Sequence, residues 1–263
     1  MGDLFLKVKN FVKFNSEKKS TTLSGALVFF VLLGIVPLAY LTSLVLTIFG
    51  KELTDITNNI NYPELVMVTN YVYSVGIKLG TSGNVIAFFV ALYSSGNIFY
   101  QLKLSGELIY SHTVKNNLIK RVFSIVTSFI VVWLYSCLAV IFLAFSPIIT
   151  ICFGEILSGL ISGVFTFLIV FSVAIFINLY TCPFKIKIQS VIWGSLYTAI
   201  FTFIMTMLFF LYINTFANYN EIYGKITVLI VFLSWLYLMV KGFIGGITLN
   251  VYLINKQSNN IKI

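Results

Sequence analysis

The sequence predicts an all-α, polytopic integral membrane protein with six transmembrane helices, a short amphipathic N-terminal helix and an amphipathic extracytoplasmic segment. The chain is 59% hydrophobic and only 10% charged, whereas a soluble domain is about 45–50% apolar and about 25% charged. Its apolar residues form long continuous runs and not the short alternating segments of a membrane barrel, so helices are expected. The basic residues lie between these runs and in the tails, where they report topology and attract anionic lipid.

The first twenty residues are basic and amphipathic. We expect a short helix lying on the inner leaflet, with a solvated basic tail as the alternative. The apolar run that begins near Leu23 is longer than the signal-peptide core of about 7–15 residues and lacks a cleavage site, so it is expected to be the first anchor. The predicted apolar face of the N-terminal helix consists of Leu4, Phe5, Val8, Phe11 and Val12.

The first transmembrane helix is expected at about 23–49, with a kink at Pro37. Residues 64–78 are amphipathic, and their apolar run is too short to cross, so we expect a helix along the outer surface. One transmembrane domain, residues 21–255, is predicted, followed by a cytoplasmic tail at 256–263. The other five spans are expected at about 83–102, 122–145 (ending before Pro147), 158–181, 190–215 and 226–254.

The distribution of basic residues sets the predicted orientation. Of the seventeen Lys and Arg residues, thirteen fall on one side of the spans, three on the other, and Lys241 lies within the last span. Because cytoplasmic loops carry the excess of Lys and Arg, both termini are expected in the cytoplasm. The three on the outer side are Lys51, Lys78 and Lys225.

Several motifs resemble the YihY/BrkB family of polytopic membrane proteins, formerly mislabelled ribonuclease BN. An F-x-x-Y followed by Y-N-x-x-Y-G occupies 209–224, W-L-Y-L occupies 235–238, and a G-x-x-L-N segment ends at residue 250. The resemblance implies a location in the cytoplasmic membrane and a role in the cell envelope, with no settled activity. The matching residues are Pro37, Tyr212, Tyr219, Asn220, Tyr223, Gly224, Trp235, Gly246 and Asn250.

The chain departs from the family pattern at three positions. Thr248 replaces the common Glu of the last motif, Gly34 replaces a Ser before the first-helix proline, and Glu107 stands where members often have Asn. A mechanism that depends on the membrane Glu is therefore in question for this chain.

The residue types argue against an enzyme. Metal-dependent phosphodiester hydrolysis needs clustered His and carboxylate ligands, but the only histidine, His112, lies in a lysine-rich loop. The three cysteines form no CxxC pair, and no phosphate-binding glycine motif is present. We therefore expect no catalytic residues, no metal, no cofactor and no nucleic-acid partner.

Polar residues within the spans are the candidates for function. A charge at mid-helix costs about 2.5–3.5 kcal/mol, so Lys241 is expected either to face a cavity or to snorkel to the head groups. Lys241 and Thr248 are seven residues apart and share a helix face, so we expect both to line a cavity open to the inner leaflet beside Pro37. Asn250 lies about 160° around from Thr248 and is expected to bond to a neighbouring helix. Asn97 is a fourth candidate.

Other features have simpler explanations. Interhelical hydrogen bonds are expected for Asn97, Asn178 and Asn250, and close helix packing for the glycine pairs 242/246 and 159/163. Tyr212, Tyr219 and Tyr223 fit an interfacial aromatic belt, with a substrate rim as the alternative.

Two functions follow from these features. The first is translocation of a lipid or other amphiphilic anion; the alternative is a non-transporting scaffold or partner subunit in envelope assembly. Expected partners are membrane lipids, including anionic ones, and either further copies of the chain or envelope proteins.

Overall fold

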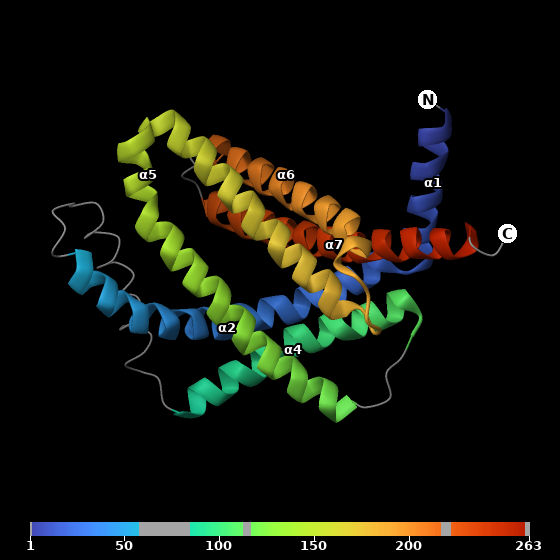
Figure 1. Cartoon of the computed structure of the whole chain (residues 1–263), viewed down its shortest axis with the longest axis horizontal. Coiled ribbons are helices and arrows are strands. Elements are labelled where there is room, and N and C mark those ends of the chain that lie inside the picture. The colour runs from blue at the N-terminus through green and yellow to red at the C-terminus, as the bar shows by residue number, and fades with distance from the viewer. Residues whose placement is uncertain (1, 58–84, 113–116, 217–221, 261–263) are drawn as a thin grey trace. The chain divides into compact units, whose positions relative to one another are not determined.

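The computed structural model describes residues 2–57, 85–112, 117–216 and 222–260, and within them the chain is helical with no strand (Figure 1). The prediction of an all-α protein is therefore confirmed. The helices are α1 (Gly2–Glu17), α2 (Ser20–Thr57), α4 (Val85–Tyr110), α5 (Asn117–Thr181), a single 3-10 turn η1 (Ile188–Ser190), α6 (Ile192–Phe216) and α7 (Ile222–Asn260).

Four described helical segments are long and apolar enough to cross a membrane. A fifth is added if two consecutive helices, Lys9–Glu17 and Ser20–Ile35, which meet at 58°, form one bent span. The described residues thus support a multi-pass membrane protein, while the total of six spans stays a prediction. The four segments are Asn117–Leu138, Ile156–Thr181, Ile192–Ile213 and Leu229–Lys256.

The predicted helices coincide with observed ones, with longer ends. Helix α2 contains the whole of 23–49 and continues through Pro37, and α4 starts near the predicted residue but extends to Tyr110. Helices α6 and α7 match 190–215 and 226–254 closely. Residues 1–20 do contain a helix, α1, although its place at the membrane surface stays a prediction. The predicted surface helix at 64–78 lies outside the described residues.

The boundary between the third and fourth predicted spans needs correction. The expected end before Pro147 is wrong, because α5 continues through this proline and breaks only at Gly154. Gly154 has φ 74° and ψ 169°, a backbone conformation that is almost restricted to glycine. The glycine, and not the proline, therefore separates the two helical segments.

The chain divides into two compact units. Unit 1 contains Met1–Phe29, Gln101–Lys115 and Thr166–Ile263, and unit 2 contains Phe30–Tyr100 and Asn116–Phe165. Helices α2, α4 and α5 each contribute one part to either unit.

Unit 2 is held together by small residues that let helices approach closely. A side chain at Gly34 of α2 would meet Ile98 of α4, and one at Gly96 of α4 would meet Ile125 of α5. The hydroxyls of Ser95 and Ser128 are 3.2 Å apart on facing helices. Short polar side chains and glycines are typical of helix contacts in lipid, where apolar burial between helices contributes little.

Unit 1 centres on α6 and α7, which run antiparallel and side by side (Figure 1). Helix α1 packs on this pair through two aromatic residues: Phe11 contacts Tyr197 and Tyr252, and Phe14 contacts Tyr252 with ring centroids 5.5 Å apart. At least part of the apolar face predicted for α1 is thus directed to protein.

Two helix ends in unit 1 use left-handed residues that are not glycine. Lys19 follows α1 with φ 51° and Ser111 follows α4 with φ 55°. The Lys18 ammonium donates a 2.7 Å hydrogen bond to the Ser111 hydroxyl. This exposed bond connects the α1–α2 junction to the end of α4 within unit 1.

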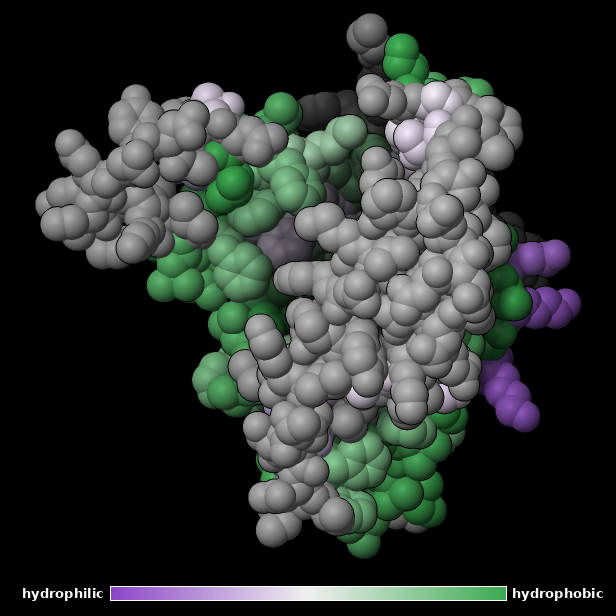
Figure 2. Space-filling view, turned by 90° about the vertical axis from the view of Figure 1, so that its left-hand side faces the viewer, coloured by the Kyte–Doolittle hydropathy of each residue, from purple (hydrophilic) through white to green (hydrophobic). Residues whose placement is uncertain are grey.

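Apolar side chains are abundant on the surface. Leu160, Val164 and Leu168 of α5 are each more than half exposed. Figure 2 shows one face on which hydrophobic residues make up most of the coloured surface, while strongly hydrophilic side chains project at one edge. Exposing such a large apolar surface to water is unfavourable, so lipid acyl chains are the surroundings that fit it.

Candidate functional site

The buried polar centre of unit 1 is the side chain of Asn250 on α7. Its Oδ1 accepts the backbone N–H of Gly194 at 2.8 Å, and its Nδ2 donates to Asn178 Oδ1 at 2.7 Å and to the Val191 carbonyl at 3.3 Å. The first N–H groups of a helix have no partner within that helix. Asn250 therefore caps the start of α6 from another helix, which confirms the expected interhelical bonding.

Asn178 extends this network to α5. Its Nδ2 donates to the Ala174 carbonyl of its own helix at 2.8 Å and to the Ser195 hydroxyl of α6 at 3.2 Å. Asn178, Ser195 and Asn250 are all fully buried. We call these three residues the asparagine network; it joins α5, α6 and α7 at one level.

Close backbone contact between α6 and α7 accompanies the network. A side chain at Gly246 would collide with the Thr198 hydroxyl and the Gly194 carbonyl, and one at Gly194 would collide with Asn250. Thr198 donates to the carbonyls of Gly194 at 2.9 Å and Gly242 at 3.3 Å. The pair Gly242 and Gly246 thus lies in the helix contact, in agreement with its predicted packing role.

Lys241 lies near the middle of the candidate span Leu229–Lys256, twelve residues after its start and fifteen before its end. These separations correspond to about 18 Å and about 22 Å of helix. The side chain is half-buried, and its ammonium lies over the ring of Tyr237, 5.9 Å from the centroid. Tyr237 is one turn closer to the start of α7, so the ammonium is directed away from the basic Lys256 end.

Thr248 is fully buried, and its hydroxyl donates to the Ile244 carbonyl of the same helix at 2.8 Å. Its backbone position agrees with the shared face predicted for Lys241 and Thr248, but its hydroxyl already has a partner. Asn97, a further candidate residue, and Pro37, beside which the cavity is expected, belong to unit 2. The cavity stays a prediction.

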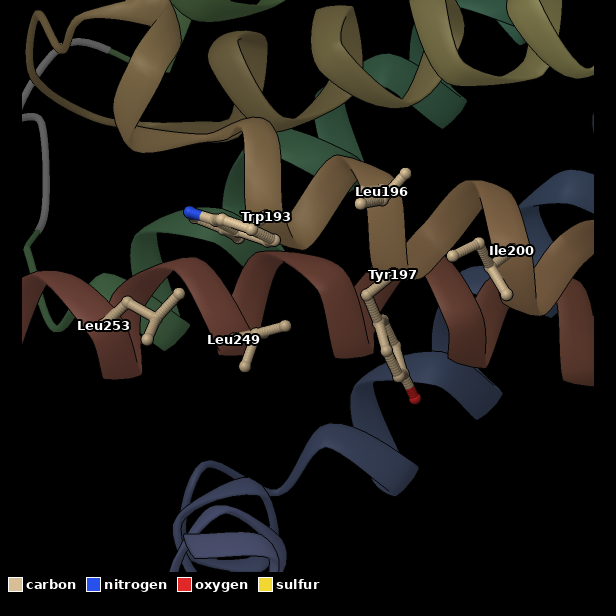
Figure 3. Close-up of a pocket in the computed structure, with 6 residues that line it drawn as sticks. All are labelled: Trp193, Leu196, Tyr197, Ile200, Leu249 and Leu253. Atoms are coloured by element: carbon tan, nitrogen blue, oxygen red, sulfur yellow. The ribbon is translucent and has the colours of Figure 1, made fainter. Parts of the chain in front are cut away.

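A groove lies on the surface of unit 1, lined by side chains of α6 and α7 (Figure 3). Its volume is about 420 Å³, within the range of about 300–1,000 Å³ common for small-molecule sites. Figure 3 shows the Tyr197 side chain extending toward the N-terminal helices and the Trp193 indole at the other end of the α6 wall. The lining residues are Trp193, Leu196, Tyr197, Ile200, Leu249 and Leu253.

A second buried cluster lies where α4 and α5 end. Cys182 is only 6% exposed, and burial raises the pKa of its thiol, although the Phe184 N–H, the Tyr110 hydroxyl and Lys103 oppose the rise. Burial also raises the pKa of Tyr110, and the neighbouring Cys182 adds to it. The ring of Phe184 meets Tyr110 and His112 edge-on, at 5.4 Å and 6.3 Å. Burial thus favours the neutral form of both groups.

The buried glycine contacts and asparagine network occur in the same segments as the predicted family motifs. Comparison with known families matches residues 11–263, nearly the whole chain, to the family described as virulence factor BrkB. The chain belongs to the BrkB family. Searches of curated proteins and of solved structures found no match. The BrkB resemblance predicted from the motifs is thus confirmed, and it carries no assigned substrate.

Three of the BrkB motif residues that the structure describes serve packing. Trp235 stacks on Phe209 of α6 at 5.0 Å, Gly246 permits close approach to α6, and Asn250 caps that helix. Tyr219 and Asn220 lie outside the described residues, and so does the side chain of Tyr223. The aromatic belt and the substrate rim therefore stay alternatives. Tyr212 is half-buried on α6.

The structure accounts for one departure from the BrkB pattern. At Gly34 an added Cβ would press on the end of the Ile98 side chain, so the serine common in the family would require Ile98 to move. Glu107, the second departure, is only 3% exposed near the end of α4. Sequence reasoning missed the groove and the capping role of Asn250, because neither depends on a local pattern.

Proposed function

We propose that this BrkB-family protein translocates a lipid or other amphiphilic anion across the cell membrane. The observation that carries the proposal is the placement of Lys241. Its ammonium lies at mid-span and is turned toward Tyr237, away from the basic end of α7. The nearer end of the span is about 18 Å of helix away, so the ammonium remains within the span while it contacts this ring. A cation at this depth offers a partner to an anionic head group that crosses the span.

The surroundings of Lys241 support this proposal. In the described part of the chain, no carboxylate pairs with Lys241, so its charge is available to an external anion. Gly242, Gly245 and Gly246 follow it and keep the backbones of α6 and α7 close. The spans around it are otherwise almost uncharged, which suits a substrate with long apolar chains.

The test is lipid translocation in reconstituted vesicles. Protein in vesicles of phosphatidylglycerol and phosphatidylcholine should move a fluorescent head-group-labelled phosphatidylglycerol, measured by chemical reduction of the dye in the outer leaflet. Lys241→Met should lower the rate at least tenfold. Its melting temperature should not fall, because the change removes a charge that costs about 2.5–3.5 kcal/mol at mid-span. Lys9→Met, at an exposed position of α1, is the control and should leave the rate unchanged.

A scaffold without transport activity is the second candidate. It is favoured by the close contact of α6 with α7 through Gly194 and Gly246, which leaves no space between these two backbones. If neither the wild-type protein nor any variant moves the labelled lipid, and Lys241→Met supports a normal envelope in cells, the scaffold is the better account.

A further inference from the structure

The groove between α6 and α7 is the feature that the proposed function does not use. It is open at the surface of unit 1 and is lined by apolar side chains. Of these, Trp193 is 64% exposed and Ile200 is 45% exposed. Its α6 wall extends over eight residues, from Trp193 to Ile200, which corresponds to about 10 Å of helix. This length is about a third of a hydrocarbon core of about 30 Å. A segment of one acyl chain next to its head group has the matching length and polarity.

One end of the groove is basic. Lys256 lies three residues beyond Leu253 on α7, and Lys187 immediately precedes η1, which leads into α6 at Trp193. Both lysines are exposed, as is Lys185. In the described part of unit 1 none of the three forms an ion pair, and the acidic residues there are Asp3 and Glu17 on α1 and the buried Glu107. The lysines give this end of the groove a positive charge that no ion pair within the described part of unit 1 neutralises.

We infer that the α6–α7 groove is a binding site for one anionic glycerophospholipid, with an acyl chain in the groove and the phosphate beside Lys187 and Lys256. The inference deepens the proposed function and rests on it for its biological meaning, since it names the substrate class and a lateral route to the protein. Tryptophan at the basic end fits this geometry, because its amphipathic ring prefers the level of the head groups.

The charges favour a lipid over a second copy of the chain. A two-fold symmetric contact along this face places the same patch of both subunits together. The lysines of one copy would then face those of the other without a compensating carboxylate, which is repulsive. A phospholipid supplies both the apolar chain and the negative charge.

The experiment uses the full chain with Trp133→Phe and Trp235→Phe, so that Trp193 is the only tryptophan. Phosphatidylglycerol brominated on its acyl chain should quench Trp193 at concentrations several-fold lower than brominated phosphatidylcholine does. Lys187→Gln and Lys256→Gln should each weaken phosphatidylglycerol binding about fivefold, the usual effect of one lysine near an anionic surface. Lys9→Gln is the matched control.

A second set of variants tests the apolar part. Leu249→Phe narrows the groove and should reduce quenching by both lipids, whereas Leu208→Phe, at an exposed site of α6 outside the groove, should not. Native mass spectrometry of the unmodified chain with the two lipids provides the same comparison if the single-tryptophan protein fails to fold.

Three outcomes overturn the site. Equal quenching by the two lipids, insensitive to both lysines, would indicate ordinary boundary lipid. Weak quenching together with a dimer in light scattering would assign the groove to a second copy. Normal lipid translocation by a Leu249→Phe protein that no longer shows quenching would reject the groove as the substrate's route and leave the proposed function intact. Conversely, tight phosphatidylglycerol binding without any translocation would reject the transport function and leave the site intact.

Discussion

Asn250 on α7 caps α6 by accepting the Gly194 N–H at 2.8 Å, across 56 positions of sequence. A capping side chain normally comes from the residue just before the helix. Here the preceding residues form the turn η1, and the cap is supplied from a neighbouring helix. The start of α6 therefore depends on its contact with α7, so local helix formation and tertiary packing are coupled at this point.

Replacing Asn250 by Ala should destabilise the protein by about 2 kcal/mol. The change leaves the buried Gly194 N–H and Asn178 Oδ1 without their partner, and each orphaned group costs about 1–3 kcal/mol, reduced by other partners available in a membrane. Thr248→Val is the matched control, because its hydroxyl bonds only to a carbonyl of its own helix. Unfolding in detergent should show a loss for Asn250→Ala and almost none for Thr248→Val. An equal loss of stability in the two variants would mean that the bond from Asn250 to Gly194 contributes no more than a bond within one helix.

Gly246→Ala should destabilise by about 1–3 kcal/mol, the cost of overpacking a tight contact. The added methyl collides with the Thr198 hydroxyl and comes within 2.6 Å of the Gly194 carbonyl. Adding Thr198→Ala should restore only part of the stability, because the carbonyl remains. Gly25→Ala, which adds its methyl to open space in a helix, should be neutral or slightly stabilising. A melting temperature unchanged by Gly246→Ala would show that α6 and α7 separate readily.

Gly154→Ala tests the break in α5. Alanine is strained at φ 74°, so the substitution should cost about 1–3 kcal/mol or force the two helical segments to realign. Gly159 lies five residues later in regular helix. The close packing predicted for Gly159 and Gly163 is wrong among the described residues, because a side chain at either position would meet open space. Gly159→Ala should therefore stabilise by up to about 1 kcal/mol. Thermal unfolding of the two variants is the measurement. Opposite signs are expected, and a harmless Gly154→Ala would contradict the assigned break.

The fold class and the helix positions could be predicted because they follow from local composition and apolar run length. The break in α5 could not, since two local rules compete there: proline disfavours a helix interior, yet α5 continues through Pro147 and stops at Gly154. Helical spacing also placed Lys241 and Thr248 on one face correctly. It could not predict that Thr248 is fully buried, because burial depends on the neighbouring helix.

The candidate site shows the same limit. The polar character of Asn250 predicted an interhelical bond, but its partners Asn178 and Gly194 are 72 and 56 positions away. The glycine at position 34 likewise depends on Ile98, whose side chain fills the space beside it from another helix. Such pairings are properties of the packed helices, and one sequence without contacts does not specify them.

The predicted topology can be tested with cysteines, but the native Cys182 is a poor reporter. It is 6% exposed, and burial raises its pKa. Because the thiolate is the reactive form, Cys182 should label slowly from either side at neutral pH. Its rate should rise only well above pH of about 8.5, the usual thiol pKa. Slow labelling of Cys182 would therefore say nothing about its side of the membrane.

Exposed positions avoid this difficulty. In a cysteine-free chain, Lys185→Cys lies at an exposed site on the side predicted to be cytoplasmic, and Ile156→Cys lies at an 86% exposed site just after the break at Gly154. An impermeant maleimide applied to intact cells should label Ile156→Cys and should label Lys185→Cys only after the membrane is opened. The charge bias of thirteen to three sets this expectation. Labelling of Lys185→Cys in intact cells would reverse the orientation, and the basic end of the α6–α7 groove would then face the outer leaflet.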